Sequence, residues 1–246
     1  MAARDRLQEF GRALLRWVRA HKIASIVLLI FFWILIEIIT LPFGSVARLK
    51  KTNPPETALM KERAEQEKER GRTFKIRQRW VPLGSISKDL VNAVIVAEDG
   101  TFWSHEGFDW YEFRESVERD IKEGRAARGA STITQQLVKN LFLSTSKNPL
   151  RKLKEWVLTW YTERVLSKSR ILELYLNVIE WGSGVFGIEA ASEYYFAKPA
   201  SALSRDEAAR LAAIIPSPRR FRPDGDSRYV ARRSNRILER MAARGY

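Results

Sequence analysis

The chain lacks cysteine and has only two histidines, His21 and His105, among 246 residues. The absence of cysteine excludes disulfide bonds, thiolate metal sites and a cysteine nucleophile. Two histidines argue against a histidine-based zinc site, and no Ser-His-acid hydrolase is expected from them. We expect His105, which lies in an acidic loop, to order that loop through hydrogen bonds rather than to act as a base.

Acidic residues are also scarce relative to basic ones. The chain has 29 Asp and Glu against 43 Lys and Arg, which gives a formal net charge of +14 and a pI near 10.2. This excess indicates an anionic partner, which could be a nucleic acid, a membrane surface or a phosphorylated ligand. The eight Trp and twelve Phe residues are too many for a disordered basic tail, so we expect a folded core.

The N-terminal region predicts a membrane anchor. Residues 1–22 form a basic tail, and residues 23–43 are apolar apart from Glu37, Thr40 and Pro42. At about 1.5 Å per residue, this helix can cross roughly 30 Å of hydrocarbon. No small-residue cleavage site follows, so we expect a retained single-pass helix. The basic tail places the N-terminus in the cytoplasm and the rest of the chain outside.

The remainder of the chain predicts an all-α fold. Residues 44–72 are charged and poor in apolar side chains, and we interpret them as a linker that is helical near residues 58–70. Residues 73–246 are expected to form one domain, which begins with a short extended segment. The apolar spacing and the capping residues predict helices at about 87–100, 109–123, 132–143, 148–166, 169–178, 204–215 and 227–244, with a glycine-rich turn at Gly182, Gly184 and Gly187.

Two acidic residues end the first of these helices. Ser87 offers an N-cap, Gly100 is suited to the left-handed conformation after the helix, and Glu98 and Asp99 lie in the last turn. The partial negative charge of a helix C-terminus does not stabilise carboxylates there. The pair is either a solvated acidic surface or a carboxylate whose pKa is raised enough for general acid or base work.

Two further segments could contact an anionic sugar ligand. In the helix at 132–143, Gln136, Lys139 and Asn140 share the face opposite the apolar one. This side is either an ordinary amphipathic surface or a site for sugar and phosphate oxygens. In the next helix, Arg151 and Lys152 are spaced to contact Glu155, as a surface ion pair or as a cationic cradle for a diphosphate.

These residues together resemble the peptidoglycan glycosyltransferases, the polymerase module of bifunctional penicillin-binding proteins that also occurs as stand-alone enzymes. The resemblance covers residues 75–225 and lies in four motifs: Glu98-Asp-x-x-Phe-x-x-His-x-Gly-x-Asp109, Gly129-x-Ser-Thr-Ile-Thr-Gln-Gln-x-x-Lys-Asn140, Arg151-Lys-x-x-Glu155 and Ser167-Lys-x-x-Ile-Leu-Glu-x-Tyr-Leu-Asn177. With no room for a transpeptidase domain, the chain looks like the stand-alone type.

The resemblance implies a lysozyme-like helical domain with a membrane-associated jaw, held at the outer face of the plasma (inner) membrane. Its members polymerise lipid II with inversion, form β-1,4 linkages and release undecaprenyl diphosphate. Glu98 would be the general base, and Glu155 would orient the donor or hold a divalent ion (Mg or Mn). The other residues that would bind substrate or support the cleft are Asp99, Phe102, His105, Ser131, Thr132, Gln135, Gln136, Lys139, Asn140, Arg151 and Lys152.

The implied partners are lipid II, the growing glycan chain and membrane lipids. Other cell-wall synthesis or division proteins are further candidate partners, and no nucleic acid is expected. One alternative is a lysozyme-type glycan-cleaving enzyme, which would not need the cations at Lys139, Arg151 and Lys152 because its leaving group is a sugar hydroxyl. The other is a non-catalytic, membrane-anchored basic scaffold, in which Glu98 would have no special role.

Overall fold

The computed structural model describes residues 6, 9, 16–123, 131–146 and 148–246. The chain divides into two compact units, Met1–Leu41 and Pro42–Tyr246. Most of the predicted basic tail and Gly129 of the second motif lie outside the described residues.

The first unit contains the predicted anchor as helix α2 (Lys22–Ile39). Its large apolar side chains are exposed, for example Ile23 at 81% and Leu29 at 69%. Within the described part of the chain, Lys22–Arg48 is the one stretch long and apolar enough to cross a membrane, so it fits a membrane anchor. The helix ends at Ile39, before the predicted end at Phe43, because Pro42 has no N–H and restricts the residue before it.

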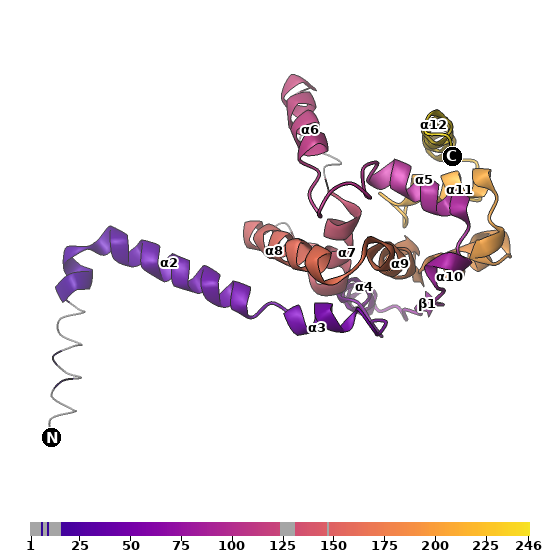
Figure 1. The fold of residues 1–246 in the computed structure, drawn as a ribbon. Helices are drawn as coiled ribbons and strands as arrows, with labels where there is room; N and C mark the ends of the chain where they lie inside the picture. Colours follow the sequence, from indigo (N-terminus) through magenta and orange to yellow (C-terminus); the bar gives the residue numbers. More distant parts are fainter. Residues whose placement is uncertain (1–5, 7–8, 10–15, 124–130, 147) are drawn as a thin grey trace. The chain divides into compact units, whose positions relative to one another are not determined.

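The second unit is mainly helical (Figure 1). Its elements are α3 (Phe43–Arg48), α4 (Ala58–Glu69), β1 (Arg77–Gln78), α5 (Lys88–Glu98), α6 (Trp110–Glu123), α7 (Ile133–Phe142), α8 (Pro149–Val165), α9 (Lys168–Val178), β2 (Glu180–Gly182), β3 (Val185–Phe186), α10 (Ile188–Phe196), α11 (Arg205–Ile214) and α12 (Arg228–Ala243), with short 3-10 turns at Leu83–Ser85 and Ala200–Ala202.

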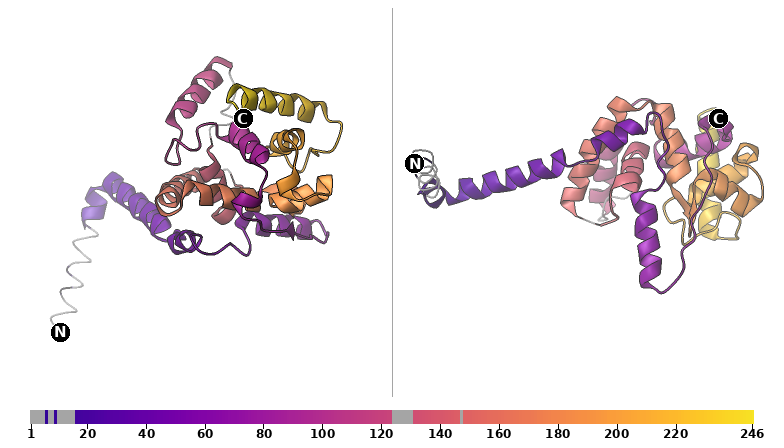
Figure 2. Two further views of the ribbon diagram at one scale, coloured as in Figure 1. Left: turned by 45° about the vertical axis from the view of Figure 1, so that its right-hand side comes forward. Right: turned by 90° about the horizontal axis from the view of Figure 1, so that it is seen from below.

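Two groups of helices build this unit. Helix α7 packs against α4, α8 and α9, while α5, α11 and α12 pack against one another. Figure 2 shows α5 and α12 running close together, with α7 and α9 nearer the middle of the unit. Helix α9 lies in the core, where Ile171, Leu172, Leu174 and Tyr175 are fully buried. The predominantly helical fold is confirmed.

Several predicted helix starts are confirmed by their caps. Thr132 and Gln135 form a capping box at the start of α7, as Ser204 and Glu207 do in α11. The Asn148 side chain accepts from the backbone N–H of Leu150 at the start of α8. These side chains satisfy backbone donors that a helix leaves without intrahelical partners.

The ends of α5 differ from the prediction. Ser87 precedes the helix but caps no backbone N–H, because its hydroxyl donates to the carbonyl of Leu203 instead. Gly100 does not adopt the left-handed conformation. The helix ends at Glu98, and Asp99 turns the chain at φ −160° and ψ 75°. The Gly100 carbonyl accepts a hydrogen bond from Arg244, so a tertiary contact replaces the expected local cap.

The prediction missed a small sheet and two helices, α3 and α10, although the expected extended segment contains β1. The glycine-rich segment forms a β2–β3 hairpin, and β1 pairs in parallel with β3, which gives the order β1-β3-β2. Gly184 and Gly187 have positive φ angles of 73° and 77°. The strands are two or three residues long, too short to produce a visible alternation in the sequence. Helix α10 follows at once, starting after Gly187.

The segment interpreted as a linker, residues 44–72, contributes to the packing of the second unit. It contains α3 and α4, and the predicted helix near residues 58–70 is confirmed as α4. Leu59 and Met60 are buried. Arg63 of α4 is 2.9 Å from the carboxylate of Glu180 in β2, an ion pair that holds the helix on the sheet.

The close approach of Gly187 to the backbone of Asn177 can be tested by substitution. A Cβ atom at Gly187 would lie 2.7 Å from the backbone oxygen of Asn177, and the φ angle of 77° is strained for any other residue. We expect Gly187→Ala to destabilise the protein by about 1–3 kcal/mol, seen as a lower melting temperature. The control is Gly84→Ala, because no heavy atom lies within 4 Å of a Cβ there. Equal melting temperatures for the two variants would contradict this packing.

Candidate active site

Glu98 is the last residue of α5, and its carboxylate is held from two sides. The Gln136 side-chain amide of α7 donates to Oε2 at 2.9 Å. The Arg233 guanidinium of α12 donates to Oε1 at 3.2 Å. The Glu98 side chain is only 10% exposed. Burial raises the pKa of Glu98, and the contacts with Gln136 and Arg233 oppose that rise. A carboxylate with a raised pKa suits proton transfer better than an ordinary surface carboxylate does.

Tyr175 of α9 fixes the orientation of Gln136. The Tyr175 hydroxyl donates to Gln136 Oε1 at 2.9 Å, which leaves the NH₂ group to face Glu98. Burial raises the pKa of Tyr175 well above its usual value, and the charges of Glu98 and Asp99 add to this effect. The phenol therefore remains a hydrogen-bond donor across the physiological pH range. The hydrogen bonds from Tyr175 to Gln136 and from Gln136 to Glu98 thus help to fix the position of the Glu98 carboxylate.

Asp99 and His105 order the loop after α5, as the sequence predicted for His105. Asp99 Oδ1 lies 2.9 Å from His105 Nε2, and Asp99 Oδ2 accepts from the backbone N–H of Ile133 at 2.9 Å. The backbone N–H of Gly107 donates to His105 Nδ1, which implies that the Nε2 proton points to Asp99. His105 therefore helps to hold the loop that follows Glu98 in place.

Three further residues that the resemblance implicates, Thr132, Gln135 and Phe102, also support this loop. The Thr132 hydroxyl donates to the carbonyl of Gly107 at 2.8 Å, while Gln135 completes the capping box with Thr132. Phe102 is fully buried in the core, with Lys168 Nζ 4.5 Å from its ring centroid. In this structure these side chains serve packing and positioning.

A cationic cluster lies on α8. Arg151 Nη1 is 2.9 Å from Glu155 Oε2, and Lys152 Nζ contacts Glu155 Oε1. Glu155 is 3% exposed, so the pair is not an ordinary surface ion pair. Both oxygens of this buried carboxylate therefore contact a cation.

Lys139 of α7 connects this cluster electrostatically with Glu98. Burial lowers the pKa of Lys139, and the charges of Glu155 and Glu98 oppose that effect while Arg151 and Lys152 add to it. The ammonium group is thus within electrostatic range of both acids. Asn140, the third predicted residue on this face, is buried at 9% exposure.

The side chains around Glu155 do not by themselves form a binding site for a divalent cation. Both of its carboxylate oxygens already contact Arg151 and Lys152. Within the part of the chain that the structure describes, no group of three or more His, Cys, Asp or Glu side chains could hold a metal ion. Mg²⁺ is usually held by one or two carboxylates together with substrate phosphates, so a divalent ion shared with a bound diphosphate stays a prediction.

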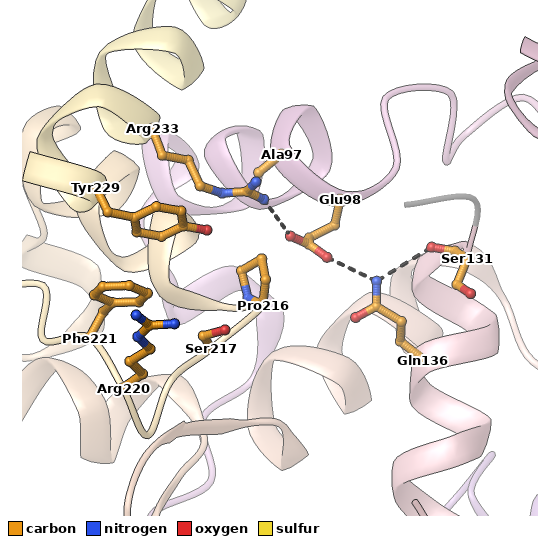
Figure 3. Close-up of a pocket in the computed structure, with 10 residues that line it drawn as sticks. All are labelled: Ala97, Glu98, Ser131, Gln136, Pro216, Ser217, Arg220, Phe221, Tyr229 and Arg233. Carbon is orange, nitrogen blue, oxygen red and sulfur yellow. Dashed lines mark hydrogen bonds and ion pairs between the residues drawn. The ribbon is translucent and has the colours of Figure 1, made fainter. Parts of the chain in front are cut away.

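A groove of about 920 Å³ opens beside Glu98 (Figure 3). Glu98, Ser131 and Gln136 form one side of it. The other side consists of residues after α11 and on α12, including Arg220, Phe221, Tyr229 and Arg233. The rings of Phe221 and Tyr229 are stacked with centroids 4.3 Å apart.

Two of the predicted binding residues, Ser131 and Gln136, thus line the groove together with Glu98. Lys139 and the α8 cluster are not among the described residues that line it. The sequence analysis missed Arg233, Arg220, Phe221 and Tyr229, because they are more than 100 residues from Glu98 in the chain. Tyr175 was part of the fourth motif, and only its hydrogen bond to Gln136 reveals its role.

Comparisons with known proteins agree with this arrangement. A family model described as Transglycosylase matches residues 66–242. The biosynthetic peptidoglycan transglycosylase of Nitrosospira multiformis is 45% identical over 212 residues, which cover 86% of this chain and 89% of the relative. The protein of the same name from Laribacter hongkongensis is 41% identical over 228 residues, 93% of this chain and 97% of the relative. That from Chromobacterium violaceum is 45% identical over 199 residues, 81% and 87% of the two chains. The chain therefore belongs to the transglycosylase family.

Proposed function

We propose that this enzyme polymerises lipid II into peptidoglycan strands, with Glu98 as the general base. The observation that carries this proposal is the environment of Glu98. Its carboxylate has a raised pKa, faces a groove, and lies within electrostatic range of Lys139. Family membership and the names of the relatives support the same reaction.

In the proposed reaction, the acceptor sugar lies in the groove beside Glu98. Glu98 removes the proton from the 4-hydroxyl, and the oxygen attacks C1 of the terminal sugar of the growing chain. The bond between C1 and the diphosphate oxygen breaks, and inversion at C1 gives the β-1,4 linkage. The proton ends on Glu98, and the electron pair leaves with undecaprenyl diphosphate. General base catalysis of this kind contributes about 10²–10⁴-fold in rate.

The cations on α7 and α8 are proposed to receive the diphosphate. Lys139, Arg151 and Lys152 would stabilise the negative charge that develops on the leaving group, and Glu155 would hold Arg151 and Lys152 in place. This cluster favours a diphosphate donor over the glycan-cleaving alternative, in which the leaving group is an uncharged sugar hydroxyl.

A lipid-linked substrate requires an enzyme that is held at the membrane, and the apolar helix α2 fits such an anchor. We propose that it places the catalytic unit at the outer face of the inner membrane, with the N-terminus in the cytoplasm. The excess of basic residues in the catalytic unit then serves the lipid diphosphate and acidic headgroups. Other cell-wall synthesis or division proteins are proposed only as further partners.

The experiment that tests this function uses the purified full-length protein in detergent with labelled lipid II. We expect long glycan strands and one undecaprenyl diphosphate released for each new linkage. The matched substrate control is a preformed glycan strand without a lipid diphosphate, which should remain intact. Shortening of the preformed strand without polymerisation of lipid II would contradict the proposal and support the glycan-cleaving alternative.

A further inference from the structure

Both oxygens of the Glu98 carboxylate are already hydrogen-bonded, by Gln136 on Oε2 and by Arg233 on Oε1. A general base must come within hydrogen-bond distance of the proton that it removes. The acceptor hydroxyl therefore needs one of these two oxygens. Each oxygen can accept a second hydrogen bond, but the Glu98 side chain is only 10% exposed. Room for the hydroxyl therefore depends on which neighbouring side chain moves more easily.

The contact with Gln136 is fixed from behind. Tyr175, which is fully buried, donates to the Gln136 carbonyl oxygen at 2.9 Å, and the Gln136 NH₂ group also lies 3.4 Å from the carbonyl oxygen of Ser131. Moving the Gln136 amide away from Glu98 would leave the buried Tyr175 hydroxyl without its acceptor. A buried donor without a partner costs about 1–3 kcal/mol.

The contact with Arg233 is held less firmly. The Nη2–Oε1 distance is 3.2 Å, the Arg233 side chain is 32% exposed, and it lines the groove (Figure 3). The buried Nε of Arg233 has no hydrogen-bond partner among the described residues, so the guanidinium is incompletely satisfied where it lies. Turning toward the groove would cost the Arg233 side chain its long hydrogen bond and ion pair with Glu98, and among the described residues no other hydrogen bond holds this side chain.

The helix that carries Arg233 is held by contacts of its own. Helix α12 packs against α5 and α11. At the far end of α12, the Arg244 guanidinium donates to the carbonyl of Gly100, and a Cβ atom at Gly100 would lie only 2.6 Å from Arg244. Since α12 is fixed on the loop after α5, any exchange at Glu98 is a side-chain movement.

We propose that Arg233 is a positioning residue, which keeps Glu98 ionised in the empty site and gives up Oε1 to the acceptor hydroxyl. This inference rests on the proposed role of Glu98 as the base. When the guanidinium leaves, the carboxylate loses a neighbouring positive charge, and its affinity for a proton increases as the hydroxyl arrives. The proton passes from the acceptor oxygen to Glu98, while Arg233 keeps its own protons throughout.

The other charged and titratable groups around Glu98 allow this effect to be isolated. Asp99 follows it in the chain, the charges of Lys139 on α7 and of Glu98 act on each other, Tyr175 lies on α9, and Arg220 and Tyr229 line the groove. Among the described residues, Arg233 is the only cation that hydrogen-bonds to Glu98. Removing Arg233 should therefore raise the pKa of Glu98 in the free enzyme, while Lys139 remains.

The test compares pH profiles of lipid II polymerisation by the full-length protein in detergent. The profile of kcat/KM reports the free enzyme, and the profile of kcat reports the enzyme–substrate complex. In Arg233→Met, the acid limb of kcat/KM should move to higher pH by about one unit, because an opposite charge at this distance lowers a carboxyl pKa by that order. The acid limb of kcat should hardly move, since the substrate has already displaced Arg233 in the parent enzyme.

Three further variants separate charge from structure. Arg233→Gln keeps a donor but loses the charge, and should show the same displacement as Arg233→Met. Arg233→Lys keeps the charge, and its acid limb should stay near that of the parent. Arg232→Met is the matched control, because Arg232 is exposed on the same helix and its Nε donates to the carbonyl of Arg228. Its profile should not move.

An unmoved kcat/KM limb in both Arg233→Met and Arg233→Gln would overturn the electrostatic role of Arg233. An equal displacement in the kcat limb would overturn the exchange, because Arg233 would then stay on Glu98 during the reaction. Either result is distinguishable from failure of the proposed function, which would appear as full activity in Glu98→Gln.

Discussion

Replacing Glu98 by glutamine should lower lipid II turnover by about 10²–10⁴-fold, the contribution expected of a general base. Glutamine has nearly the same shape, but its single acceptor oxygen can accept from Gln136 or from Arg233 and not from both. It also cannot accept the proton of the acceptor hydroxyl. The measurement is the rate of strand formation by purified protein. Polymerisation at the parent rate would remove Glu98 from the role of base.

The same variant should keep nearly the stability of the parent. Because burial raises the pKa of Glu98, the folded protein binds this proton more tightly than the unfolded chain does. The stability linked to this proton is present at low pH and lost as the pH rises through the pKa of the folded state. At pH 7 a neutral glutamine removes that cost but also loses one of the two hydrogen bonds at residue 98, so the melting temperature should change little. Glu239→Gln, on an exposed part of α12, is the control and should change neither activity nor melting temperature.

Replacing Lys139 by methionine should lower turnover by about 10²–10³-fold, as expected when one preorganised charge is lost from a developing anion. Methionine keeps most of the buried stem of the side chain and removes only the ammonium group. Because burial lowers the pKa of Lys139, the folded state disfavours its charge, and removing that charge should not reduce the melting temperature. The measurement is again strand formation, compared at saturating lipid II.

Lys88→Met is the matched control for Lys139. Lys88 begins α5, at the opposite end of that helix from Glu98, and its side chain is exposed. The control removes the same charge from the same unit, so it should leave turnover unchanged. A comparable loss in both variants would show that total charge, rather than a site at Lys139, governs the rate.

The sequence predicted the elements with strong local signals. The cap residues before α7, α8 and α11 and the apolar spacing of α5 are local signals that indicate where these helices begin and which face they bury. The supporting role of His105 was also predictable, because it lies six residues from Asp99 in the same loop. Local hydrogen bonding decides these features, so a sequence pattern is sufficient to find them.

Features that depend on distant residues were not predictable in the same way. The side chain of Ser87 turns to Leu203, and the Gly100 carbonyl accepts from Arg244, and these tertiary contacts replace the local caps that the sequence suggested. Arg233 reaches Glu98 across 135 residues of chain, so no motif spacing indicates the pair. The short strands β2 and β3 are held by pairing with each other and with β1 rather than by a pattern of their own.

The most direct test of the whole account is an experimental structure of Glu98→Gln bound to lipid II and a lipid-linked glycan. The account predicts the 4-hydroxyl of the acceptor sugar within about 2.6–3.2 Å of residue 98. It also predicts that the donor diphosphate contacts Lys139 and the α8 cations Arg151 and Lys152. A diphosphate bound away from these three cations, with no sugar hydroxyl near residue 98, would contradict it.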